Sequence, residues 1–235
     1  MSTTRPDRSR RKFFKLLPLA MLAGCNASPS GGLGSVARSF QSVNDWLQGK
    51  VFDPAKLAPE YSDAEVTPVA GFRTNSYDTD APDMDVAEWT LTVDGLVSKP
   101  GEYALAQIQA FPKRTQNTRH VCVEGWSMIP QWGGTPMAAL LDFVGADPAA
   151  KFLSVECGDD YYTSYDMGSA RHPQTILAYE AYGKALDLGH GAPLRIVMPV
   201  KLGYKSAKWL TRIEVTNEKK GGYWEDDGYD WFAGT

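Results

Sequence analysis

The sequence predicts a single α+β domain built on mixed and antiparallel sheets. From Glu88 onward, segments with the alternation of β-strands outnumber helical segments, and clusters of Gly, Asp and Pro separate them. No βαβ rhythm repeats along the chain, which argues against a doubly wound parallel sheet. The 235 residues, 43% of them hydrophobic and 22% charged, suffice for one sizeable core but are few for two full domains.

The first 24 residues have the layout of an export signal. Paired arginines in SRRKFFK (9–15) precede the nine-residue apolar run LLPLAMLAG (16–24), which is far shorter than the roughly 20 residues of a membrane-spanning helix. SRRKFFK resembles the twin-arginine export motif, and LAGC, which ends at Cys25, resembles the lipobox of bacterial lipoproteins. We therefore expect a twin-arginine lipoprotein signal over 1–24, a periplasmic location and a lipid anchor at Cys25. Cleavage elsewhere, which leaves a soluble protein, is the alternative.

The segment between this signal and the regular elements has two parts. Residues 25–39 are rich in Gly, Ser and Pro, which predicts a flexible tether. Residues 40–71 are irregular and punctuated by proline, with a short helix expected around Phe40–Leu47, and we expect them to wrap the domain as an arm. The catalytic domain is then 72–235.

The regular elements follow in order. A strand is expected at 89–97, a short helix at 103–111 stopped by Pro112, a strand running into a loop at 120–126, and five more strands at 152–157, 161–166, 176–182, 194–200 and 211–217. Between them, Thr135 is expected to cap a helix with Pro136 at its first position and Gly145 beyond its end. Its buried face comprises Met137, Leu140, Leu141 and Val144.

Charge and motif content exclude several classes of protein. The formal charge is −4, and removing the net +5 of the first 24 residues leaves −9, a poor composition for binding nucleic acid. The sequence has no P-loop and no GxGxxG. With three histidines and no HExxH or CxxC spacing, a zinc centre is not expected.

Cys122 stands in the apolar and aromatic stretch RHVCVEGWSMIPQWGG (119–134). If 120–126 is a strand, Cys122, Glu124 and Trp126 share one face by its period of two, with His120 beside them. A small buried core cysteine is one alternative, and a disulfide with Cys157 in an oxidising compartment is another. Composition alone leaves all three interpretations open.

A resemblance to a known family distinguishes these three interpretations of Cys122. CVEGWS followed by a tryptophan, glycines and the helix PMAALLDFVG (136–145) resembles the core of the sulfite-oxidase-like molybdopterin family. The block YGKALDLGHGAPLRIVMPVKLGYKSAKWLTRIEV (182–215) is similar to the same family, and the likeness runs from Phe72 to Val215. It implies a sulfite-oxidase-like molybdopterin-binding fold with molybdenum-molybdopterin as cofactor.

The resemblance also implies site residues. Cys122 takes the position of the cysteine that ligates molybdenum, and a soft thiolate suits that metal. The positions that the resemblance assigns to cofactor contact are Asn75, Tyr77, Cys157, His190, Arg195, Ser206, Ala207 and Lys208, with Arg73 and Thr74 as neighbours of the first two. Arginine and lysine provide the positive charge and donors that a buried pterin phosphate requires.

The residues after Cys122 bear on the reaction. Sulfite oxidases follow their cysteine with arginines, whereas VEGWSM here resembles the branch of periplasmic protein-methionine-sulfoxide reductase catalytic subunits. We expect reduction of an S-oxide or related oxide by oxygen-atom transfer, with Cys122, Glu124 and Trp126 at the reacting centre. A sulfite dehydrogenase and a cofactor-free binding lipoprotein on the same fold are the alternatives.

Electrons should come from a haem-containing partner. The sequence has no CxxCH for c-type haem, so the partner is expected to be another polypeptide, with a membrane haem subunit as one candidate.

The chain lacks the extra sheet domain after Val215 through which eukaryotic-type sulfite oxidases dimerise, which predicts a monomer. The tail GYWEDDGYDWFAGT (222–235) is aromatic and acidic. It is either a docking surface for the electron-transfer partner or a strap that packs Trp224, Tyr229 and Trp231 on the domain.

Overall fold

The computed structural model describes residues 32–76 and 81–235, and the chain forms two compact units, 1–50 and 51–235. Helix α2 spans Gly32–Val51. It begins inside the segment predicted to be a tether and extends well beyond the short helix expected around Phe40–Leu47. Cys25 and the rest of the predicted signal lie outside the described residues. In the part of the chain that the structure covers, no helix has the length and apolarity needed to cross a bilayer.

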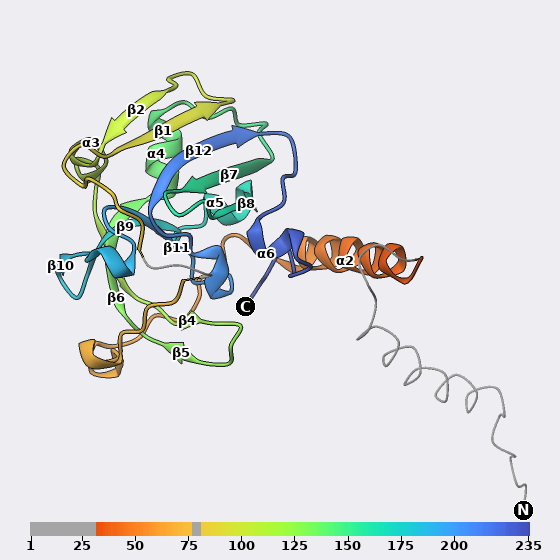
Figure 1. Cartoon of the computed structure of the whole chain (residues 1–235), viewed down its shortest axis with the longest axis horizontal. Helices are drawn as coiled ribbons and strands as arrows, with labels where there is room; N and C mark the ends of the chain where they lie inside the picture. Colours follow the sequence, from red (N-terminus) through yellow and green to blue (C-terminus); the bar gives the residue numbers. More distant parts are fainter. Residues whose placement is uncertain (1–31, 77–80) are drawn as a thin grey trace, which may run out of the picture. The chain divides into compact units, whose positions relative to one another are not determined.

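The first sheet of the larger unit is mixed. Its strand order is β2 (Gly101–Ala104), β1 (Thr90–Gly95), β12 (Leu210–Thr216), β7 (Phe152–Cys157) and β8 (Tyr162–Asp166) (Figure 1). β1 and β12 run parallel, and the other pairs are antiparallel. Leu91 and Val93 of β1 are fully buried while the residues between them are not, as the alternation in the sequence predicts.

The second sheet is antiparallel. It has the order β10 (Lys184–Ala185), β9 (Ile176–Ala181), β6 (Gln131–Pro136) and β3 (Arg114–Asn117), and β11 (Arg195–Val197) also pairs with β9. Neither β3 nor β6 is predicted from the sequence. β6 contains Gly133 and Gly134, which have low strand propensity, but a Cβ on Gly134 would lie 2.2 Å from the carbonyl oxygen of Leu177. The glycine is therefore what allows β6 to approach β9.

Strands β4 (His120–Val121) and β5 (Ser127–Met128) form a two-stranded hairpin, which differs from the predicted structure of this segment. The expected strand over 120–126 ends at Val121. The backbone N–H of Cys122 donates to the carbonyl of Trp126 at 2.9 Å, and Gly125 has φ of +86°, so 122–126 is a turn. The period-two argument for a shared face is wrong, although the same side chains meet by another route.

Short helices join the strands. They are α3 (Leu105–Gln109), α4 (Met137–Phe143), α5 (Met167–Ala170) and α6 (Tyr223–Asp226), with 3₁₀ turns η2 (Asp63–Glu65), η3 (Val69–Gly71), η4 (Leu188–His190) and η5 (Gly203–Lys205). The predicted buried face of α4 is confirmed, since Met137, Leu140, Leu141 and Val144 are all fully buried. The predicted cap is wrong: Thr135 belongs to β6, and its hydroxyl donates to the carbonyl of Ile108 at 2.7 Å.

Residues 52–71 follow the surface of the larger unit. The backbone N–H of Tyr61 donates to the carbonyl of Asn117 at 3.0 Å, and the backbone N–H of Thr67 donates to the carbonyl of Ile129 at 2.9 Å.

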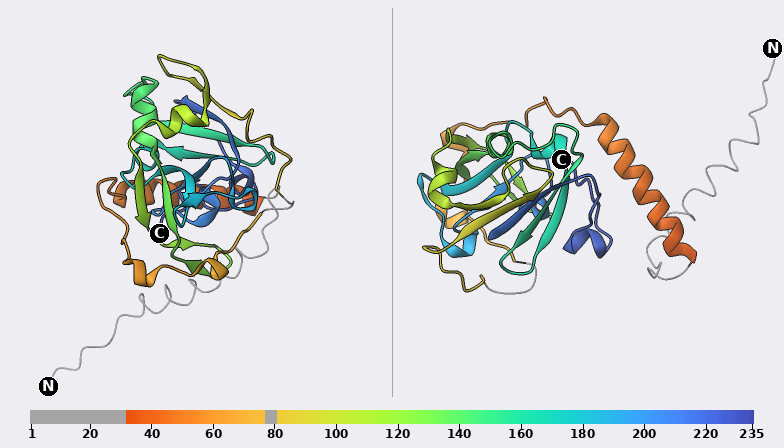
Figure 2. Two further views of the ribbon diagram at one scale, coloured as in Figure 1. Left: turned by 90° about the vertical axis from the view of Figure 1, so that its left-hand side faces the viewer. Right: turned by 90° about the horizontal axis from the view of Figure 1, so that it is seen from above.

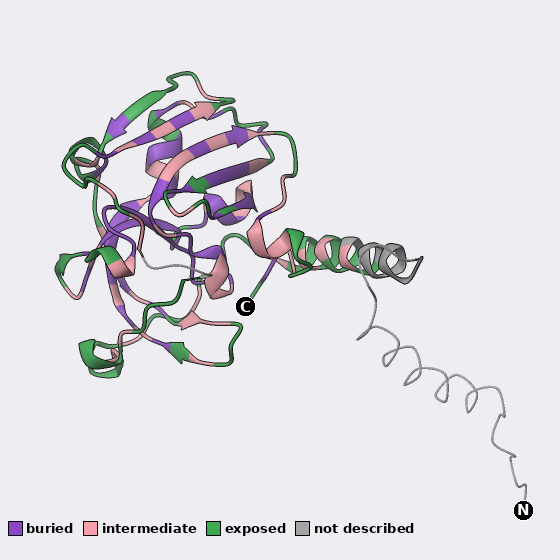
Figure 3. Cartoon of the chain, in the orientation of Figure 1, coloured by how far each residue is buried: buried purple, intermediate pink, exposed green. Residues whose placement is uncertain are grey.

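Figure 3 shows that buried residues concentrate in the strands and α4, which enclose one large apolar cluster and a smaller one around Trp132 and Ile176. Figure 2 shows the strands of the larger unit, joined by loops and short helices, from two further sides. The predicted α+β class with mixed and antiparallel sheets is confirmed.

Candidate active site

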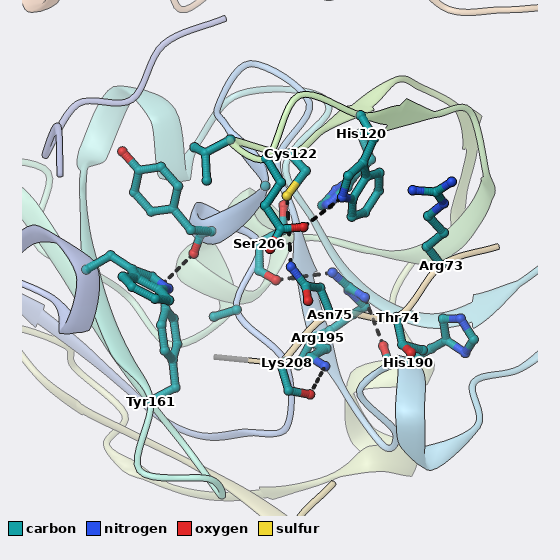
Figure 4. Close-up of a pocket in the computed structure, with 18 of the residues that line it drawn as sticks. Arg73, Thr74, Asn75, His120, Cys122, Tyr161, His190, Arg195, Ser206 and Lys208 are labelled. Atoms are coloured by element: carbon teal, nitrogen blue, oxygen red, sulfur yellow. Dashed lines mark hydrogen bonds between the residues drawn. The ribbon is translucent and has the colours of Figure 1, made fainter. Parts of the chain in front are cut away.

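A pocket of about 1060 Å³, its open mouth included, collects side chains from distant parts of the sequence (Figure 4). Its lining comes from 73–76, the β4–β5 turn, the loop before β8, the block 189–208 and the C-terminal segment. Cys122, Glu124 and Trp126 all line it, together with His120. The hairpin turn therefore presents the residues that the sequence predicted for the reacting centre.

Cys122 is a half-buried free thiol that lines this pocket. The amide nitrogen of Asn75 lies 4.0 Å from its sulfur. Trp126 donates from Nε1 to Oε2 of Glu124 at 2.9 Å, and this bond, followed by one from Asn75, lowers the pKa of the Glu124 carboxyl. Glu124 is therefore a carboxylate at neutral pH beside the thiol. The Arg73 guanidinium lies 5.4 Å from the Trp126 ring centroid.

His120 lines the pocket as a neutral ring. Burial, and secondarily the charge of Arg195, lowers its pKa to about 3. It lies close to η5, because a Cβ on Gly203 would be 2.7 Å from His120 Nε2. A side chain at residue 203 would thus displace the imidazole.

One side of the pocket, the cationic wall, consists of His190, Arg195, Ser206 and Lys208. Arg195 is buried and donates to the carbonyls of His190 at 2.9 Å and Ser206 at 3.1 Å. Burial lowers the pKa of Arg195 to about 10, so the guanidinium stays protonated at neutral pH. Its face covers the Trp132 ring at 4.8 Å.

Lys208 adds a second cation to this wall. Its ammonium donates to Oγ of Ser76 at 3.2 Å, and burial followed by repulsion from Arg195 lowers its pKa to about 8. The loop that holds both cations is tight at Gly191, which has φ of +102° and where a Cβ would lie 3.0 Å from Cβ of Lys208.

Two buried polar atoms of the cationic wall are available to a ligand. Nε of Arg195 and Nε2 of His190 are buried and have no hydrogen-bond partner among the described residues. His190 is fixed by Asp187, whose carboxylate lies 2.8 Å from Nδ1, and by stacking on Phe72 at 3.8 Å. Because buried polar groups are normally satisfied, Nε of Arg195 fits an anionic group that enters the pocket, and Nε2 of His190 fits a polar atom of the same ligand.

The opposite side, the aromatic wall, consists of Tyr161, Tyr204, Trp224 and Tyr229. In Figure 4, Tyr161 lies across the pocket from His190 and Arg73. The C-terminal tail supplies Trp224 and Tyr229, and Trp231 packs beneath, donating from its indole to Oγ of Ser164 at 2.8 Å. Of the two interpretations of the tail, the structure favours the strap.

Two predicted cofactor contacts do not appear in this lining. Tyr77 lies outside the described residues. Cys157 ends β7 inside the hydrophobic core, 7% exposed, and burial raises the pKa of its thiol well above the usual value. Both it and Cys122 are free, so the structure contains no disulfide between them. Asn75, His190, Arg195, Ser206, Ala207 and Lys208 do line the pocket.

Asp159, Tyr161 and Tyr204 also line the pocket and were not predicted from the sequence. Tyr204 directly precedes the Lys-Ser-Ala-Lys run of the matched block, so its position was a usable signal. Asp159 and Tyr161 follow β7 in a turn, and no local sequence pattern predicts that this turn lines the pocket.

A half-buried thiol and a buried guanidinium with an unpaired Nε, which line one pocket on this two-sheet fold, indicate a molybdopterin-dependent oxidoreductase. The residues fit that cofactor, because Cys122 can supply a thiolate to the metal and the cationic wall can hold the pterin phosphate. Within the described residues no group of three or more His, Cys, Asp or Glu gathers to hold a metal by itself, which is compatible with a pterin that brings further ligands.

Comparison with known proteins gives the same class. Residues 78–224 match the oxidoreductase molybdopterin binding domain, and the chain belongs to that family. It is 42% identical over 217 residues, 92% of this chain and 83% of the relative, to an Azospira oryzae protein with the provisional name protein-methionine-sulfoxide reductase subunit YedZ1. It is 32% identical over 209 residues to protein-methionine-sulfoxide reductase catalytic subunit MsrP of Pseudomonas syringae pv. tomato, covering 77% of this chain and 62% of MsrP.

Among solved structures, the sulfane dehydrogenase SoxCD from Paracoccus pantotrophus superposes with a TM-score of 0.57 at 21% identity. The match covers 74% of this chain and 52% of that chain. At this identity the similarity shows the fold alone, and it agrees with the predicted sulfite-oxidase-like molybdopterin-binding fold.

Proposed function

We propose that this enzyme reduces the S-oxide of a thioether, with methionine sulfoxide as the first candidate. The net reaction takes R₂S=O, two electrons and two protons to R₂S and water. The names of the relatives support this substrate class. The observation that carries it in the structure is the Glu124 carboxylate beside Cys122. This carboxylate disfavours a sulfite anion beside the thiol, whereas a neutral sulfoxide carries no net charge for it to repel.

The chain's own residues would divide the work. Cys122 would hold the metal, and Arg195, Lys208, Ser206 and His190 would hold the pterin and its phosphate. When bound, the cofactor supplies a metal centre that accepts an oxygen atom and exchanges two electrons. Asn75 bridges the Cys122 sulfur and Glu124, and Trp126 fixes the Glu124 carboxylate, so these three side chains orient the reacting side of the pocket.

The decisive experiment uses holoenzyme made in a host that supplies the cofactor. With reduced viologen as electron donor, the enzyme should consume N-acetylmethionine sulfoxide and release the thioether. Sulfite should not reduce a cytochrome in its presence. Absence of turnover with any S- or N-oxide, or robust sulfite-dependent reduction of the cytochrome, contradicts the proposal.

We further propose that a haem-containing partner, separate from this chain, donates the electrons in the periplasm. Relatives named as subunits support a partner, and the twin-arginine pattern with LAGC supports export and acylation of Cys25. Cell fractionation tests the anchor: Cys25→Ala should move the enzyme from the membrane fraction to the soluble periplasmic fraction. An unchanged distribution would show that Cys25 is not the anchor.

A further inference from the structure

The C-terminal segment Gly222–Thr235, here called the strap, forms part of the pocket although the family match ends at residue 224. It begins with α6 and brings Trp224 and Tyr229 to the aromatic wall. Tyr229 thus lies outside the part of the chain that defines the family. A pocket residue in such a segment is a candidate for what is particular to this enzyme.

The strap is anchored along its length. Glu225 forms a buried ion pair with Lys205, their side chains being 2% and 1% exposed, and accepts a hydrogen bond from Thr163 at 2.6 Å. Further along the strap, the hydroxyl of Tyr204 donates to the carbonyl of Asp230 at 2.5 Å. The backbone N–H of Leu202 donates to the carbonyl of Ala233 at 2.8 Å. Because it is fixed on both sides of Tyr229, the strap presents its aromatic side chains in a defined place.

Trp224 and Tyr229 form one surface. Their ring centroids are 5.0 Å apart, Tyr204 lies 5.7 Å from Tyr229 at a steep angle, and the backbone N–H of Tyr229 donates to the carbonyl of Trp224 at 2.9 Å. The rings offer apolar faces without formal charge. Such faces suit a methyl group and a polarisable sulfur.

The same two side chains carry spare donors. The hydroxyl of Tyr161 is engaged with the carbonyl of Tyr204 at 2.7 Å, and that of Tyr204 with Asp230. Within the described residues, neither the indole N–H of Trp224 nor the hydroxyl of Tyr229 makes a hydrogen bond. Both can therefore donate to an acceptor in the pocket, and the oxygen of a sulfoxide is a strong acceptor.

We propose that Trp224 and Tyr229 form the substrate subsite that binds the methyl sulfoxide end of a methionine sulfoxide side chain. Their rings contact the methyl group and sulfur, and their N–H and O–H groups donate to the S–O oxygen. This inference rests on the proposed function and adds the residues that select its substrate. The subsite favours a neutral methyl sulfoxide over a charged oxyanion, because the pair supplies donors and apolar area but no cation.

The test measures KM and kcat for N-acetylmethionine sulfoxide, and calorimetric Kd on the oxidised holoenzyme, where no turnover occurs. Tyr229→Phe removes one donor and keeps the ring, so KM and Kd should rise about three- to tenfold with kcat within twofold. Trp224→Leu should raise both about two- to tenfold, and Trp224→Phe should recover the part due to the aromatic face. Asp227→Asn, at an exposed residue of the same strap outside the pocket lining, should leave both constants unchanged.

The possible results distinguish failure of the subsite from failure of the proposed function. Unchanged KM and Kd in both Tyr229→Phe and Trp224→Leu overturn the subsite while leaving the proposed function intact. A fall in kcat accompanied by loss of molybdenum or a lower Tm, at constant Kd, assigns the strap a purely structural role and also overturns it. If the wild-type enzyme neither binds nor reduces any sulfoxide, the proposed function fails and the subsite fails with it.

Discussion

The cationic and aromatic walls of the pocket differ in origin and in chemistry. The cationic wall comes from one stretch of chain, 190–208, and carries two cations: the buried Arg195, whose Nε has no partner among the described residues, and the half-buried Lys208. The aromatic wall is assembled from three separate segments and offers rings and hydroxyls. A compact block of sequence thus supplies the residues proposed to hold an anionic cofactor, whereas the surface proposed to contact the substrate depends on how distant segments pack.

The largest effect should come from Cys122, the residue between the two walls. Cys122→Ser replaces a soft thiolate by a hard hydroxyl, so molybdenum retention and sulfoxide turnover should fall by more than about 100-fold. Elemental analysis and viologen-coupled turnover measure the two effects. Cys157→Ser is the matched control, because that thiol is buried in the core outside the pocket lining, and it should keep both metal and activity. The reverse result would move the metal site to Cys157.

The anchor of the aromatic wall comes next. Glu225→Gln leaves the Lys205 ammonium buried without its counter-charge, which should lower the free energy of unfolding by about 3–5 kcal/mol. Denaturant unfolding measures it, and Glu218→Gln, at an exposed residue, should change stability by less than about 0.5 kcal/mol. The double variant Lys205→Met/Glu225→Leu should regain much of the loss. If Glu225→Gln is neutral, the ion pair does not hold the strap.

A substitution in the cationic wall should instead lower the affinity for the cofactor. Arg195→Met removes a buried charge and its donors, so cofactor affinity should fall about 10- to 100-fold. Retained molybdenum after dialysis measures this loss. Arg212→Met, which removes an arginine paired with Asp94 and Glu156 on the first sheet, should leave cofactor content unchanged. Equal losses in both variants would assign Arg195 a general structural role.

The smallest effect concerns the pH dependence of Lys208. Its pKa is about 8 in the free pocket, so below pH 8 the ammonium is present to bind an anion. Above pH 8 an anion must bind with uptake of a proton, and affinity for inorganic phosphate should fall by up to about tenfold per pH unit. Calorimetry on cofactor-free protein from pH 7 to 9.5 measures the slope. Lys208→Arg keeps the charge and should flatten it, and an identical slope in both proteins would exclude Lys208 as the titrating group.

Local patterns in the sequence determined the α+β class, most strands and the buried face of α4. They did so because strand alternation and helical periodicity report on neighbours along the chain. The predictions of Cys122 as the metal ligand and of the cationic-wall residues also came from the sequence, through resemblance to a family.

Tertiary structure decided the rest. It turned the chain at Gly125, so that Cys122, Glu124 and Trp126 meet in the pocket around a hairpin turn instead of along a strand. It placed Cys157 in the core and drew the tail across the pocket through the buried Lys205–Glu225 pair. These outcomes depend on burial and on pairing between residues far apart in the chain, whose energies no local window of sequence contains.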